Sequence, residues 1–270
     1  MEYPLLGYRW HLISRADISI SLIEQIRYYF TAQLFGLILP AKLGGDAYRF
    51  AALRTHSAAN ARLLALIVQE RMVGLASYLI LFLLGALVFE LTDLGSGLAP
   101  AARAGVRLLE LGFGAMLGLL LVLPLSLALA ERIMGRFAVA IPAKIVRAIR
   151  QSCSLWSIRE LVPVLFLSLV GAASWCLVVL LIATNLGVDL QVPALLMICT
   201  AAELVRLVPL TVQGIGVREG TFAMAFVLTG HSAESGFAVG VVAYLLVSLA
   251  DILIGFIGWC WSKTIGLSPV

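Results

Sequence analysis

Long apolar runs constrain the fold of this chain more than any other feature of its sequence. Three of them carry no charged residue and are long enough to cross a bilayer as helices: Met72–Phe89, Leu111–Ala130 and Leu161–Val188. A fourth run, Gly236–Trp261, contains one acid, Asp251. Hydrophobic residues make up 61% of the chain and charged residues 13%, whereas a soluble domain is about half apolar and a quarter charged. The sequence therefore predicts an all-α, polytopic integral membrane protein with about five to eight transmembrane or re-entrant helices.

The remaining composition argues against several function classes. The four cysteines show no CxxC spacing and the three histidines lie far apart, so neither a disulfide framework nor a metal site is indicated. The chain contains no GxxxxGK[ST] run, and we expect no ATPase activity of its own. We also expect no catalytic residue and no cofactor. The net charge of +4 comes from loops between the spans, where membrane orientation explains it without a nucleic-acid partner.

Lysine and arginine counts predict how the chain is oriented. Residues 1–62 hold seven of these residues and residues 131–160 hold six, whereas residues 92–107 hold two and residues 184–192 hold none. Cytoplasmic loops of membrane proteins are enriched in lysine and arginine. We therefore expect the two basic segments to face the cytoplasm from a cell (inner) membrane, with the C-terminus also cytoplasmic.

Two further apolar segments are too short to span, and each ends at a proline followed by glycines. Tyr28–Leu39 forms only about 18 Å of helix; residues 1–27 before it are predicted to be interfacial, and the polar stretch after it, to Arg62, to be mobile. Val192–Val208 is the second such segment, and Thr221–Thr229 is again about half a span. On the predicted topology the two breaks enter the membrane from opposite sides. This pattern favours an inverted repeat with two broken helices and a midplane binding site, although two ordinary loops are the alternative.

Charged residues inside apolar segments cost about 2.5–3.5 kcal/mol each near the helix centre, so each of them requires a reason. Glu203 and Arg206 are three residues apart and can pair on one helix face, either as a structural ion pair or as a substrate contact. Glu70 and Arg71 are adjacent and need partners elsewhere, or they form an interfacial pair. Asp251 has no basic residue within a helical turn or two. It is therefore the candidate residue for proton coupling.

Glycines followed by an arginine occur twice and indicate a site for a phosphate group. Gly44-Gly45 and Gly214-x-Gly216 allow positive φ angles and let backbone N–H groups face an anion at the start of a half-helix. Arg49 and Arg218 lie just beyond them. We expect these two arginines to bind a lipid phosphate.

The same residues carry a family resemblance. Leu39–Arg49 looks like a Leu-Pro-Gly-x-x-Gly-Gly-Asp-x-x-Arg motif, Glu70-Arg71 looks like the Glu-Arg of the next helix, and Pro209–Gly220 is similar to Pro-x-x-x-Gly-Gly-x-Gly-x-Arg-Glu-Gly. Ala41 replaces the usual Gly, and Gln213 stands where Pro or Gly is common. These motifs resemble the flippase-like transmembrane domain of lysylphosphatidylglycerol synthases, which also occurs in stand-alone membrane proteins of the UPF0104 type.

The resemblance implies that residues 1–270 form a single flippase-like transmembrane domain that moves a phospholipid or lipid-linked substrate between leaflets. Family members have two further spans before the Arg-Trp region, and the full synthases carry a soluble aminoacyl-transferase domain after the membrane part. We expect both to be absent here, and with them lysyl transfer. The predicted substrate-binding residues are Pro40, Gly44, Gly45, Asp46, Arg49, Glu70, Arg71, Glu203, Arg206, Gly214, Gly216, Arg218 and Glu219.

Two alternatives stand beside lipid translocation. The chain could be an integral-membrane transferase, or an accessory subunit, acting on a lipid or polyprenyl-linked substrate. Asp46 and Glu219 could then serve as loop-borne acids, although both could equally cap helices, and capping is favoured for Glu219. The expected partners are a membrane lipid and, among proteins, a second copy of the chain or a lipid-synthesis enzyme.

Overall fold

A computed structural model describes residues 2–57, 59–92, 94, 96–97, 100–134, 158–206, 211 and 214–264, without the side chains of 121–134, 158 and 263–264. The elements are α1 (Glu2–Ser14), α2 (Leu22–Gly36), the 3-10 helix η1 (Pro40–Lys42), α3 (Leu43–Leu53), α4 (Asn60–Leu91), α5 (Pro100–Met134), α7 (Ile158–Asn185), α8 (Val192–Arg206), α9 (Val217–Leu228) and α10 (Ala233–Thr264). Within these described ranges there is no strand, only an isolated bridge between Ile18 and Ser57. The predicted all-α class is confirmed.

Three helices are long and apolar enough to cross a membrane by length and composition: Asn60–Leu91, Arg159–Asn185 and Ala233–Ser262. They coincide with three of the four predicted spans. The fourth, residues 111–130, falls in α5, and part of it lies outside the described side chains. The chain is thus an all-α membrane protein.

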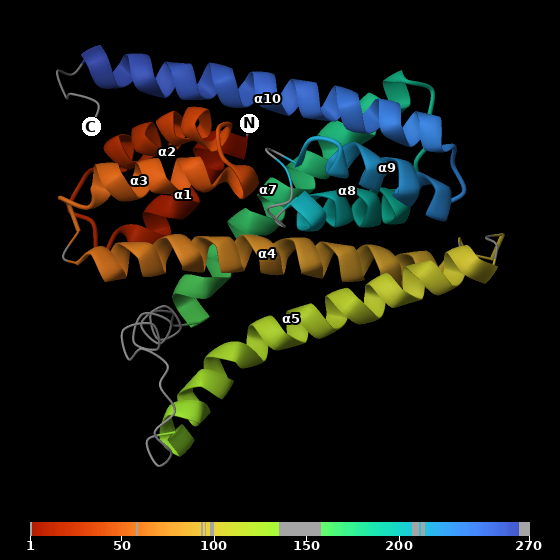
Figure 1. Ribbon diagram of the computed structural model, residues 1–270, viewed down its shortest axis with the longest axis horizontal. Coiled ribbons are helices and arrows are strands. Elements are labelled where there is room, and N and C mark those ends of the chain that lie inside the picture. Colours follow the sequence, from red (N-terminus) through yellow and green to blue (C-terminus); the bar gives the residue numbers. More distant parts are fainter. Residues whose placement is uncertain are drawn as a thin grey trace.

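The helices form two units that follow the same order. A first hairpin (α2, η1 and α3) precedes the long helix α4, and a second hairpin (α8 and α9) precedes the long helix α10. Figure 1 shows both hairpins between α4 and α10, the first on the left and the second on the right, while α4 and α10 run in opposite directions. α10 packs along α2, and α4 packs along α8. The two units thus repeat one order of elements with their long helices antiparallel. α4 packs on the hairpin of the other unit, and α10 packs on both hairpins.

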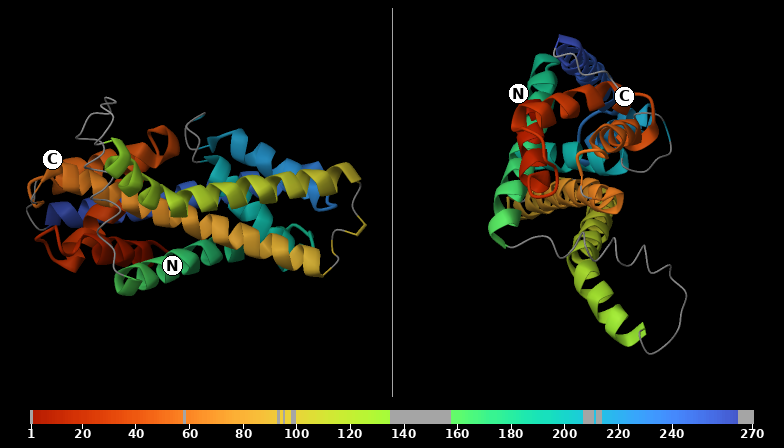
Figure 2. Two further views of the ribbon diagram at one scale, coloured as in Figure 1. Left: turned by 90° about the horizontal axis from the view of Figure 1, so that it is seen from below. Right: turned by 90° about the vertical axis from the view of Figure 1, so that its left-hand side faces the viewer.

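α5 connects the two units and lies apart from them over much of its length. Its first part packs against α4 and α9, and Figure 2 shows its other end diverging from the helix bundle. The predicted basic segment 131–160 begins there, and residues 135–157 of it are outside the described part of the chain.

The N-terminal region differs from the prediction. Residues 1–27 were expected to be interfacial, but they contain α1 and the start of α2, with Trp10 and Arg27 almost completely buried. The stretch after Asp46, expected to be polar and mobile, continues as α3 to Leu53. A scan for apolar runs misses α1 and α3 because both contain charged residues. In the structure Arg9 of α1 and Arg49 of α3 are buried in ion pairs.

Local signals explain where the first hairpin begins. Ser21 caps α2: its hydroxyl oxygen accepts a hydrogen bond from the Glu24 backbone N–H at 3.3 Å, and the Glu24 carboxylate accepts from the Ser21 N–H at 3.0 Å. These hydrogen bonds hold the pKa of the exposed Glu24 carboxyl below its usual value. With this capping box α2 begins at Leu22, six residues before the apolar run that the sequence predicts from Tyr28.

The apolar core consists of two clusters. One surrounds Trp10, Tyr29 and Leu66, and the other surrounds Trp175 and Phe222 and includes Phe82 and Phe89 of α4. Charged side chains of both units line one cavity. The fold therefore places buried charge at the junction of the two repeats.

Candidate functional site

A cavity of about 230 Å³ lies where the two hairpins approach each other between the long helices. Its walls come from α1, both hairpins, α4, α7 and α10. Ten Arg, Lys, Asp and Glu side chains line it: six cations (Arg9, Lys42, Arg49, Arg71, Arg206 and Arg218) and four carboxylates (Glu2, Asp46, Glu70 and Glu203). So much buried charge inside a membrane helix bundle is costly and marks a functional site.

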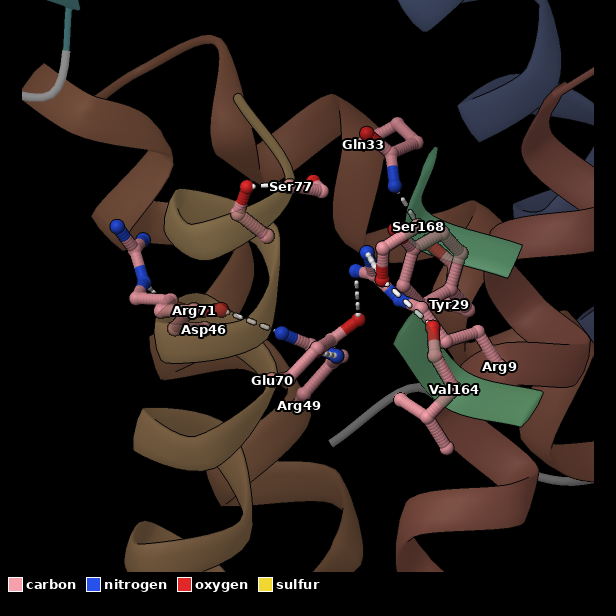
Figure 3. A network of polar contacts seen from close by, with 11 residues as sticks. Arg9, Tyr29, Gln33, Asp46, Arg49, Glu70, Arg71, Ser77, Val164 and Ser168 are labelled. Atoms are coloured by element: carbon pink, nitrogen blue, oxygen red, sulfur yellow. Dashed lines mark hydrogen bonds and ion pairs between the residues drawn. The ribbon is translucent and has the colours of Figure 1, made fainter. Parts of the chain in front are cut away.

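The first cluster comprises Arg9, Asp46, Arg49, Glu70 and Arg71, and Figure 3 shows them in contact around α4. Glu70 bridges two arginines: its carboxylate accepts from Arg9 Nη2 at 2.8 Å and from Arg49 Nη1 at 2.5 Å. The Asp46 carboxylate likewise accepts hydrogen bonds from two arginines, from Arg49 Nη2 at 2.6 Å and from Arg71 Nε at 2.5 Å. The Glu70-Arg71 pair thus finds its partners in other helices, as the sequence predicts for adjacent residues.

Backbone and hydroxyl groups complete this first cluster. Arg71 Nη2 donates to the carbonyl oxygen of Ala41 at 2.8 Å, and Arg9 Nη1 donates to the hydroxyl of Ser168 at 3.0 Å. The cluster therefore ties α1, η1, α3, α4 and α7 together.

The second cluster comprises Glu203, Arg206 and Arg218. The Glu203 carboxylate accepts from Arg206 Nε at 2.9 Å and from Arg218 Nη2 at 3.2 Å. The predicted pairing of Glu203 with Arg206 on one face of α8 is present. Arg218, from the start of α9, joins it, so one glutamate again bridges two arginines.

Each hairpin places one arginine over the ring of a tryptophan from the preceding helix. The Arg49 guanidinium lies 4.5 Å from the centre of a Trp10 ring and 5.3 Å from that of Tyr29. The Arg218 guanidinium lies 4.5 Å from the centre of a Trp175 ring. Cation–π stacking of this kind holds the planar fork in one orientation. The repeat thus presents two matched, oriented arginines to one cavity.

Asp251 is not the isolated acid that the sequence suggests. Its carboxylate lies 2.9 Å from Lys42 Nζ and accepts a hydrogen bond from the Tyr3 hydroxyl at 3.0 Å. Lys42 is far away in sequence but close in space because α10 packs on the first hairpin. The sequence shows no partner for Asp251 because helical spacing identifies only partners on the same helix, and the structure supplies one from the first hairpin.

The glycines of the two motifs play different roles. Gly214 and Gly216 have positive φ angles of 77° and 82°, as expected. In the first motif the positive φ angles belong to Ala41 and Lys42 instead, at 51° and 55°. The expectation that Gly44-Gly45 supply this turn is therefore wrong.

Close packing explains why glycines occupy positions 44 and 45. A Cβ atom at Gly44 would lie 2.0 Å from the carbonyl oxygen of Phe35, and one at Gly45 would lie 2.6 Å from that of Ala32. Both glycines let α3 approach the backbone of α2 closely. They shape the hairpin, and only Gly45 also reaches the cavity wall.

The predicted site residues are brought together only in part. Gly45, Asp46, Arg49, Glu70, Arg71, Glu203, Arg206 and Arg218 line the cavity, whereas Pro40, Gly44, Gly214, Gly216 and Glu219 do not. Glu219 caps α9, its carboxylate accepting from the Gly216 N–H at 2.7 Å. Pro209 and Gln213 of the second motif lie outside the described residues.

Sequence reasoning missed Arg9, Lys42, Trp10 and Trp175 as site residues. Arg9 and Trp10 belonged to a segment predicted to be interfacial, and Trp175 lies in an apolar run where it resembles ordinary core. The signal that could have found the tryptophans is their repetition: each occurs in the helix before a hairpin that carries an arginine.

The described part of the chain contains no group of three or more His, Cys, Asp or Glu side chains placed to hold a metal ion. In comparisons with known proteins, the model of the family "Lysylphosphatidylglycerol synthase TM region" matches residues 1–255. No curated protein and no solved structure matches the chain.

Proposed function

The chain belongs to the lysylphosphatidylglycerol synthase TM region family, and from this premise we propose that it translocates a membrane lipid between leaflets, without an ATPase of its own. The observation that carries the proposal is the pair of tryptophan-stacked arginines, Arg49 and Arg218, at one cavity between two opposed hairpins. Opposed broken helices with ligand groups near the midplane are a recurrent transporter arrangement.

The cavity residues supply hydrogen bonds in place of those that a lipid headgroup loses when it leaves water. A phosphate bound to Arg49 or Arg218 gains charge-assisted, bidentate hydrogen bonds, which replace its hydration. The acyl chains stay in the bilayer, so only the headgroup needs a polar path. This lowers the barrier to crossing without any chemical step.

The glutamates make binding reversible. Glu70 and Glu203 are already paired with Arg49 and Arg218. An incoming phosphate therefore displaces a carboxylate from an arginine. The carboxylate returns when the headgroup leaves. Movement is then downhill or coupled to protons, with Asp251 or Glu203 as the candidate residue for proton coupling. The lysine and arginine counts support an orientation with the C-terminus in the cytoplasm.

Reconstitution in liposomes with a headgroup-labelled anionic lipid tests the proposal. We expect Arg218→Ala and Arg49→Ala to abolish most of the transfer between leaflets, and Arg218→Lys to retain part of it, because lysine keeps the charge but loses the planar fork. Arg107→Ala is the matched control, since Arg107 is exposed and lies 3.9 Å from Glu90 outside the cavity.

Protein amount and melting temperature are matched for all variants. If both alanine variants transfer lipid at the rate of the parent while remaining folded, translocation through this site is wrong. The accessory-subunit role then gains support.

A further inference from the structure

Charge is unevenly balanced in the cavity, and the imbalance occurs twice. The first cluster has three cations and two carboxylates, and the second has two cations and one carboxylate. Each therefore carries a formal charge of +1. An uncompensated charge away from water is costly. Each cluster thus lacks one negative charge.

The other charged groups of the cavity reduce this excess but do not remove it. Lys42 is paired with Asp251, and Glu2 lines the cavity as one further carboxylate. Counted together, these three groups lower the total formal charge from +2 to +1. Among the described residues Glu2 forms no ion pair with an arginine of either cluster.

Each cluster also lacks one hydrogen-bond acceptor. The Nε–H groups of Arg9 and Arg218 are buried without a partner, and the two residues are only 8% and 2% exposed. Buried polar groups are nearly always hydrogen-bonded, so an orphaned one requires an explanation. Both arginines line the cavity. A ligand oxygen bound at each cluster would supply the missing acceptor together with the missing charge.

The size of the cavity limits which ligands can supply both the missing negative charge and the missing hydrogen-bond acceptor. Its 230 Å³ is below the range of about 300–1,000 Å³ for pockets that enclose drug-sized ligands. A long oligosaccharide does not fit, and a headgroup with one phosphodiester offers a single anionic centre. Two linked phosphates offer two centres within a compact volume.

We infer that the ligand of this cavity is a lipid with a diphosphate headgroup, one phosphate at each arginine cluster. The inference rests on the proposed function and narrows its substrate class. In this arrangement the first unit binds one phosphate through Arg9 and Arg49, and the second unit binds the other through Arg218 and Arg206. The diphosphate bridges the two repeats.

Calorimetric titration of the full chain in an uncharged detergent tests the inference. The probes are geranylgeranyl diphosphate, geranylgeranyl monophosphate and inorganic diphosphate, with empty micelles as the baseline. We expect the parent to bind geranylgeranyl diphosphate about tenfold or more tightly than the monophosphate, because charge-assisted bonds form at two centres instead of one. Inorganic diphosphate should bind more weakly than the prenyl diphosphate.

Two variants each neutralise the excess charge of one cluster. Arg9→Gln and Arg218→Gln are expected to bind the diphosphate and the monophosphate with affinities within about threefold of each other, since one phosphate centre remains. Arg9→Lys and Arg218→Lys keep the charge and should restore part of the preference, which separates a ligand contact from a loss of folding. Arg107→Gln serves as the exposed control.

Equal affinity of the parent for the diphosphate and the monophosphate would overturn the inference, as would a preference that survives in both glutamine variants. Inorganic diphosphate binding as tightly as the prenyl lipid would also overturn it and assign the site to a soluble diphosphate. These outcomes concern binding only. The translocation assay can therefore fail while the diphosphate preference holds, and the reverse.

Discussion

The two arginine clusters use the same chemistry but connect different parts of the fold. In the first cluster Glu70 belongs to the long helix α4, so its bonds to Arg49 and Arg9 tie the first hairpin to two other helices. In the second cluster Glu203 and Arg218 belong to the two arms of one hairpin. The ion pairs of the second cluster stay within its hairpin, whereas those of the first cluster join its hairpin to α1 and α4. Both hairpins pack on the long helices, so the two clusters differ in which elements their ion pairs hold together.

Removal of the bridging glutamates tests this difference most strongly. Glu70→Ala removes the carboxylate bound by Arg9 and leaves Arg49 with Asp46 as its carboxylate partner, and we expect a loss of about 3–5 kcal/mol in unfolding free energy. Glu203→Ala should cost less, because the side chain of Arg206 is 17% exposed and can reach water. The measurement is thermal unfolding in detergent. Equal losses in the two variants would contradict the idea that ion pairs between helices stabilise the fold more than those within one hairpin.

Two glycine substitutions, one in each hairpin, compare a loss of close packing with a strained backbone angle. Gly44→Ala brings a Cβ to 2.0 Å from a backbone oxygen of α2, and overpacking of this kind costs about 1–3 kcal/mol. Gly216→Ala meets no atom within 4 Å but keeps a φ of 82°, a strain of about 1–2 kcal/mol. We therefore expect the lower melting temperature for Gly44→Ala. Gly220→Ala, with open space and an ordinary helical φ, is the neutral control.

Tryptophan substitutions compare how well each arginine is oriented. Arg49 keeps the Tyr29 ring when Trp10 is replaced, whereas Trp175 is the stacking ring recorded for Arg218 among the described residues. Cation–π contacts contribute about 0.5–2 kcal/mol. We expect Trp175→Leu to slow translocation of the anionic lipid, per folded molecule, several-fold more than Trp10→Leu does. A larger effect at Trp10 would place the more important arginine in the first unit.

Loss of the cap on α2 gives the smallest expected effect. Ser21→Ala removes the acceptor for the Glu24 N–H, which costs about 1 kcal/mol. Because the pKa of Glu24 is held below its usual value of 4.5, the stabilisation by its carboxylate is present above that pH and is lost as the pH falls through the lowered value. Melting temperatures at neutral pH and near pH 3 should differ less in Ser21→Ala than in the parent. An unchanged pH dependence would show that the cap does not stabilise the hairpin.

The sequence predicts the long spans and the two breaks because these depend on local apolar length and on Pro and Gly. It also identifies Glu70, Arg71, Glu203 and Arg206 as buried charges in need of partners. It cannot supply the partners themselves: Arg9 reaches Glu70, and Lys42 reaches Asp251, only through packing between distant helices.

The first glycine motif shows a second limit. Its glycines were read as turn residues, yet the left-handed backbone falls on Ala41 and Lys42. Gly44 and Gly45 are required by the carbonyl groups of α2, and these are visible only after the hairpin has formed. A glycine kept for its φ angle and one kept for its missing side chain look alike in sequence.

The crossed packing of the long helices has a consequence for biosynthesis. α2 packs on α10, which is made much later, and α8 packs on α4, which is made before it. The first hairpin therefore lacks this neighbour until α10 has been synthesised, whereas α8 of the second hairpin finds α4 already made. α9 follows α8 directly and also packs on α10. Contacts so distant along the chain slow folding. Neither half forms a finished module by itself, and the two halves, made as separate polypeptides, would depend on complementation to acquire the native structure.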